Sequence, residues 1–100
     1  MQYIAATFDS ANNKVVIVCR DVGNSKYGTA VVGTVSGTSI SFGSPVVFES
    51  ASVAWISSTY DSTNAKVIIA YVDEGNSDYG TVVVGTVSGT SISFGTAVVF

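Results

Sequence analysis

Oxygen-bearing side chains gather in two corresponding loops of the sequence, and these residues are the most able to do chemistry. The second loop holds Asp73, Glu74, Asn76 and Asp78. Carboxylate and amide oxygens are the ligands that Ca²⁺ prefers, so this loop is a candidate calcium site. The first loop has Val22 and Lys26 where the second has Glu74 and Asp78, and its spacing fits no EF-hand. We therefore expect no metal and no other cofactor.

The sequence supports acid–base or nucleophilic catalysis less well than it supports a calcium site. A glycosidase needs two convergent carboxylates, but Asp9 and Asp61 both begin an Asp-Ser-x-Asn phrase, in which the carboxylate caps its own turn. The chain has no histidine, so no Ser–His–Asp triad can form and nothing activates the single cysteine, Cys19. We interpret Cys19 as a small core hydrophobe. The sequence predicts that the chain is not an enzyme.

The composition narrows the possible partners. Of the 100 residues 47% are hydrophobic and 11% are charged, and the net charge of −3 includes no basic stripe that would bind nucleic acid. No apolar run approaches the roughly 20 residues of a membrane-spanning helix, and Met1–Ile4 lacks the features of a secretory signal. We expect a soluble chain that binds neither nucleic acid nor a membrane, and one cysteine does not indicate a compartment.

Two copies of one sequence make up the chain. They are residues 1–48 and 53–100, and residues 49–52 link them. The segment Val31–Gly43 recurs unchanged as Val83–Gly95, 52 positions later. A repeat of this period predicts a supersecondary unit that buries its apolar surface by stacking on its neighbours.

The residue pattern of each copy predicts four β-strands separated by turn residues. In the first copy the strands are Tyr3–Phe8, Lys14–Arg20, Thr29–Val35 and Ser39–Phe48, and in the second they are Val53–Tyr60, Lys66–Val72, Thr81–Val87 and Ser91–Phe100. The short connections predict a four-stranded antiparallel meander in each copy. The second and third strands are continuously apolar, so both of their faces should be buried. The fourth strand alternates, as an outer strand does.

Several phrases resemble a known family. Tyr79-Gly80-Thr81, Gly85–Thr90 and Ser91–Gly95 are similar to phrases in the blades of highly repetitive β-propellers, as in tail-fibre-like surface proteins. The repeat length is also close to the kelch period of about 50 residues. The resemblance implies that each copy is one propeller blade, and such blades usually lack assigned chemistry.

Two blades cannot close a ring, because a propeller has about 4 to 8 blades. We therefore expect an all-β protein that completes a β-propeller by head-to-tail homo-oligomerisation, with a trimer favoured and a tetramer next. The chain starts and stops at copy boundaries, which favours an excised or engineered fragment of a repetitive propeller.

The loop between the second and third strands resembles the Asp-box of sialidase-type propellers. Its two versions are Asp21-x-Gly23-x-Ser25-x-Tyr27 and Asp73-x-Gly75-x-Ser77-x-Tyr79, with the aromatic residue one position later than in that box. We predict a structural role, in which the aspartate accepts backbone N–H groups, the glycine adopts a positive φ and the aromatic ring fixes the loop to the sheet.

From these features of the sequence we expect one of two functions. The first is a structural, self-assembling propeller module. The alternative is a carbohydrate-binding, lectin-like propeller whose aromatic residues, such as Trp55, stack on glycans; its candidate loop residues are Asp21, Asn24, Tyr27, Asp73, Asn76 and Tyr79. The loop of the first copy carries a local charge of about +1 and that of the second about −3, which would favour contacts between unlike copies of different chains and disfavour contacts between like copies.

Overall fold

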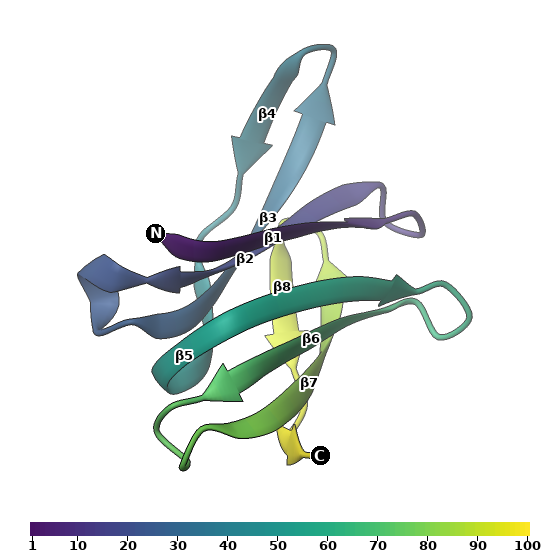
Figure 1. The fold of residues 1–100 in the computed structure, drawn as a ribbon. Helices are drawn as coiled ribbons and strands as arrows, with labels where there is room; N and C mark the ends of the chain where they lie inside the picture. Colours follow the sequence, from purple (N-terminus) through teal and green to yellow (C-terminus); the bar gives the residue numbers. More distant parts are fainter.

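The computed structural model describes residues 1–100, and its regular structure is β-strand apart from one 3₁₀ turn, η1 (Val22–Asn24). The strands are β1 (Gln2–Asp9), β2 (Lys14–Asp21), β3 (Tyr27–Ser36), β4 (Ser39–Phe42), β5 (Val46–Asp61), β6 (Lys66–Asp73), β7 (Tyr79–Ser88), β8 (Ser91–Phe94) and β9 (Val98–Val99). All nine belong to one open antiparallel sheet (Figure 1). The all-β prediction is confirmed. No helix in the structure has the length and apolar character needed to cross a bilayer.

The two copies share one hydrogen-bonding register. β2 and β3 pair from Val15↔Gly33 to Asp21↔Tyr27. β6 and β7 pair from Val67↔Gly85 to Asp73↔Tyr79, which is the same register 52 positions later. Runs of β-branched residues in these strands suit the pleated, extended backbone, so the equal sequences form equal ladders.

The predicted fourth strands, Ser39–Phe48 and Ser91–Phe100, are each interrupted. β4 ends at Phe42, the N–H of Gly43 donates to the Val32 carbonyl at 2.9 Å, and pairing with β3 resumes at Val46. Pro45 lies in this gap and has no N–H to give to a ladder. The same gap separates β8 from β9 in the second copy.

Residues 49–52, the predicted link between the copies, lie inside the 16-residue strand β5 (Val46–Asp61). The first part of β5 pairs with β3 as far as Ser52, and its second part pairs with β6 from Val53 onward. β5 therefore passes from one half of the sheet to the other, curving as it does so (Figure 1). The predicted boundary between the copies falls within one continuous strand.

The core lies where the two halves of the sheet face each other. Successive strand residues point to opposite faces, so each copy has two faces. We name as the front face Val16, Val18, Ala30 and Val32 with their second-copy counterparts Ile68, Ala70, Val82 and Val84. We name as the back face Val15, Ile17, Val31, Val35 and Ile40 with their counterparts Val67, Ile69, Val83, Val87 and Ile92. The core joins the front face of the first copy to the back face of the second.

Candidate functional site

The two predicted loops hold their aspartates as turn-forming groups. The Asp21 carboxylate accepts the Gly23 N–H at 3.1 Å, and the Asp73 carboxylate accepts the Gly75 N–H at 3.0 Å. Both loops lie between the second and third strands of their copy. The prediction that these aspartates cap backbone N–H groups is confirmed.

The role predicted for the loop glycines is wrong. Neither Gly23 nor Gly75 has a positive φ, and the left-handed positions are Ser25 (55°) and Lys26 (62°) in the first loop and Ser77 (54°) and Asp78 (59°) in the second. Gly75 instead allows close packing, because a Cβ atom there would lie 2.6 Å from Cβ of Ala51.

The other candidate ligand residues do not converge on a common site. Asn24 and Asn76 are exposed, Tyr27 is half-buried and Tyr79 is exposed. The backbone N–H of Tyr79 donates to the Asn76 carbonyl at 3.0 Å, which closes the second loop. No hydrogen bond joins a candidate residue of one loop to one of the other loop.

Two of the acidic residues considered for calcium, Asp73 and Glu74, have protein partners. Glu74 accepts the Ser52 hydroxyl at 2.6 Å and lies 3.6 Å from the Arg20 guanidinium. No three carboxylate, histidine or cysteine side chains lie close enough together to hold a metal ion. The Arg20–Glu74 pair joins the first copy to the second within one chain, whereas Lys26 and Asp78 form no ion pair. The attraction expected between unlike loops of different chains stays a prediction.

The Asp-Ser-x-Asn turns are capped by their own aspartates, as predicted. Asp9 accepts backbone N–H groups from Ala11 and Asn12, both at 3.0 Å, and the Asn12 side-chain amide at 2.8 Å. Burial raises the pKa of Asp9, but the hydrogen bonds from Asn12 and Ala11 outweigh burial and hold it below its ordinary value. Hydrogen bonds from Asn64 likewise lower the pKa of Asp61.

One cluster of ionisable groups was not predicted. The Tyr71 hydroxyl donates to the Glu49 carboxylate at 3.0 Å, and Asp73 lies beside them. Burial raises the pKa of Glu49, with a further contribution from Asp73, and burial also raises the pKa of Tyr71. The available signal was that Glu49 is the only charged residue of the segment 49–52.

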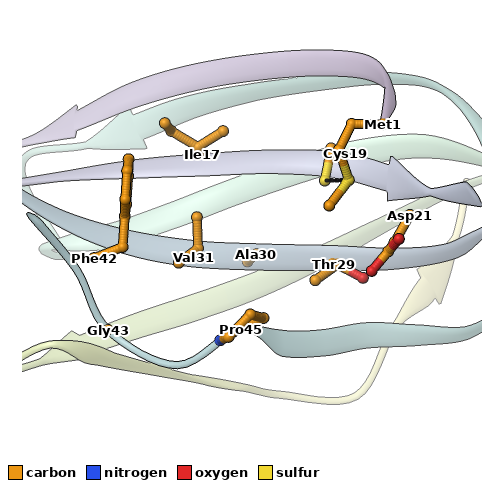
Figure 2. Close-up of a pocket in the computed structure, with 10 residues that line it drawn as sticks. All are labelled: Met1, Ile17, Cys19, Asp21, Thr29, Ala30, Val31, Phe42, Gly43 and Pro45. Carbon is orange, nitrogen blue, oxygen red and sulfur yellow. Dashed lines mark hydrogen bonds between the residues drawn. The ribbon is translucent and has the colours of Figure 1, made fainter. Parts of the chain in front are cut away.

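A pocket with a volume of about 230 Å³ opens on the back face of the first copy. Its lining includes Met1, Ile17, Cys19, Val31, Phe42 and Pro45 (Figure 2). Figure 2 shows Met1 beside Cys19 at one end of the pocket and Phe42 at the other. Its walls are mainly apolar, which suits an apolar occupant.

Cys19 is buried in the wall of this pocket, and its thiol lies 3.4 Å from the Met1 sulfur. Burial raises the pKa of the Cys19 thiol, and the charge of Asp21 adds to the effect. The neutral thiol is therefore favoured, and the interpretation of Cys19 as a small buried hydrophobe is confirmed.

Aromatic residues also meet across the copies. The rings of Tyr3 and Trp55 lie 5.0 Å apart, and the Arg20 guanidinium lies 4.8 Å from the centre of the Tyr3 ring. Trp55 remains largely exposed.

Comparison of the chain with models of protein families, with curated proteins and with solved structures gives no match. No relative therefore indicates a function, and the surfaces of the chain itself are the guide.

Proposed function

We propose that this chain is a structural, self-assembling module without catalytic activity, in which two propeller blades associate head to tail with further copies to close a ring. One observation carries the proposal. The two exposed faces of the chain are the counterparts of the two faces that form its core. The front face of the second copy of one chain would then pack on the back face of the first copy of the next.

Exposure differs sharply between equivalent residues of the same type. On the front face Val32 is 1% exposed and its counterpart Val84 is 41% exposed. On the back face Val87 and Ile92 are 5% and 4% exposed, whereas Val35 and Ile40 are 55% and 44% exposed. Paired apolar surfaces of this kind mark sites of protein association.

Positions that differ between the copies also favour this contact. On the front face the cross-strand pair Val18↔Ala30 corresponds to Ala70↔Val82, so a valine and an alanine exchange strands and the total volume stays the same. Volume-conserving changes preserve a packed interface best. At these two positions the exposed front face therefore fills the same space as the buried one, whereas Ile68 adds one methylene relative to Val16.

At the edge of the core a charged contact has an apolar counterpart. Arg20 and Glu74 form the ion pair that joins the two copies of the chain. Their counterparts are Val72 and Val22, which would meet between two chains. In an ion pair each charge has an opposite charge as its partner, and in a valine pair each apolar side chain has an apolar partner. A charge placed opposite a valine would be left without a partner.

A head-to-tail contact produces a ring when its rotation closes and a filament when it does not. Propellers have about 4 to 8 blades. Three chains would supply six blades, and four chains would supply eight. We propose the trimer, with the tetramer as the next alternative.

Native mass spectrometry across a concentration series tests the proposal. The unmodified chain should form one discrete closed species that persists on dilution. V84K should stay folded by circular dichroism but remain monomeric, because it places a charge on the front face. T63K is the matched control, since it adds the same charge to a hairpin turn that belongs to neither face. A folded monomer at every concentration for the unmodified chain would exclude the assembly.

Carbohydrate binding is a second candidate, which the exposure of Trp55 beside Tyr3 favours. Exposed aromatic rings provide flat apolar surfaces of the kind on which small ligands stack. Trp55 is the only tryptophan, so its fluorescence would report saccharide binding without a label. No spectral change across a broad saccharide panel would exclude this site.

A further inference from the structure

The pocket on the back face of the first copy has a counterpart in the second copy, and a phenylalanine lies there. The Phe48 ring lies 5.1 Å from the Tyr71 ring and 5.9 Å from the Phe94 ring, measured between ring centres. Tyr71 and Phe94 belong to the second copy, and their counterparts in the first are Cys19 and Phe42. These two residues stand at opposite ends of the pocket (Figure 2).

Phe48 and its own counterpart, Phe100, are held alike on their own copies. A Cβ atom on Gly28 would lie 2.6 Å from the Phe48 ring, and one on Gly80 would lie 2.9 Å from the Phe100 ring. Each ring therefore covers a glycine of the neighbouring strand. Phe48 then reaches the aromatic rings of the other copy, whereas Phe100 is exposed and meets none.

The pocket also has room for such a ring. In the second copy Tyr71 fills part of the space beside Phe48. In the first copy Cys19 takes the place of Tyr71, and a pocket of about 230 Å³ is left. The side chains at its two ends, Cys19 and Phe42, are a buried neutral thiol and an aromatic ring, both of which favour contact with an apolar group.

We infer that the pocket is the docking site for Phe100 of a second copy of this chain. The inference rests on the proposed head-to-tail assembly, and it identifies the residue that anchors one chain in the next. Phe48 in the core gives the geometry of the contact, and Phe100 repeats it between chains.

The first experiment measures the dissociation of the full chain on dilution by sedimentation velocity and compares F100A with Y79A. Both variants remove an exposed aromatic side chain, but Tyr79 lies on the copy whose back face is already covered within the chain. Loss of a buried aromatic anchor should raise the concentration of half-dissociation by about 10-fold or more. Y79A should leave it within about twofold of the unmodified chain.

A double-mutant cycle then tests the contact itself. C19W fills the pocket and should weaken assembly when Phe100 is present. In the F100A background the same change should cost much less, because no ring competes for the space. Circular dichroism establishes that each variant is folded, and the comparison of F100A with Y79A decides alone if C19W does not fold.

The outcomes separate the two proposals. Failure of the unmodified chain to assemble would overturn the head-to-tail assembly and the Phe100 contact together. Assembly that F100A weakens no more than Y79A does would overturn the Phe100 contact alone. Additive effects of C19W and F100A would also overturn it.

Discussion

Equivalent residues of the two copies contribute differently to the stability of the fold, because they are buried to different extents. Asp9 is fully buried and Asp61 is partly exposed, although both cap an equivalent Asp-Ser-x-Asn turn. D9A should lower the free energy of unfolding by about 1–3 kcal/mol at pH 7, because the turn N–H groups of Ala11 and Asn12 lose a charged, buried acceptor. The lowered pKa of Asp9 means that its contribution is present above the ordinary value of 3.8 and is lost as the pH falls below it. Urea unfolding at pH 7 and pH 3 measures both effects. D61A should cost less, and an equal cost would contradict the role of burial.

The contribution of Glu49 to stability should change with pH in the opposite direction to that of Asp9. Its pKa is raised above the ordinary value of 4.5, so the stability linked to its protonated form is full below that value and is lost as the pH rises through the raised pKa. E49Q keeps an acceptor for the Tyr71 hydroxyl without the charge. Its melting temperature should exceed that of the unmodified chain at pH 7.5, and the difference should shrink toward pH 4. A difference that stays constant with pH would show that the Glu49 charge carries no linked cost.

At the scale of the elements, the gaps that follow β4 and β8 each begin with a glycine, and these two glycines form a matched pair. A Cβ atom on Gly43 would lie 2.0 Å from the Thr90 carbonyl oxygen, whereas on Gly95 the nearest atom would be 3.9 Å away. G43A should therefore destabilise the fold, by about 1–3 kcal/mol. G95A should leave the stability of a monomeric V84K background unchanged. In the assembly, Gly95 would approach Thr38 of the next chain, so G95A should weaken association in sedimentation. Unchanged association would contradict the equivalence of the two contacts.

The elements also show what could be predicted from the sequence. The ladders and the Asx-type turns were predictable because β-branched runs and Asp–Asn capping act locally. The gap at Gly43–Pro45 had a partial local signal, since proline cannot donate to a ladder, but the equivalent gap at 95–97 contains no proline. The continuity of β5 through 49–52 had none, because Ser and Ala have little strand preference and only pairing with β3 and β6 fixes them. The Glu49–Tyr71 contact and the pocket depend on which faces meet in three dimensions.

For the whole molecule, the decisive property is that the two exposed faces differ. If they bind each other, blocking opposite faces in two populations of the chain should leave one functional contact between them. V35K blocks the back face of the first copy, and V84K blocks the front face of the second. Each variant alone should be monomeric, and an equimolar mixture should form a one-to-one dimer that grows no further, because both outer faces carry a charge. Native mass spectrometry distinguishes the species, since separate isotope labels identify each variant.

An isologous contact would behave differently, because V35K alone would dimerise through its front faces or V84K alone through its back faces. Only a heterologous contact, the kind that can close into a ring, requires the mixture.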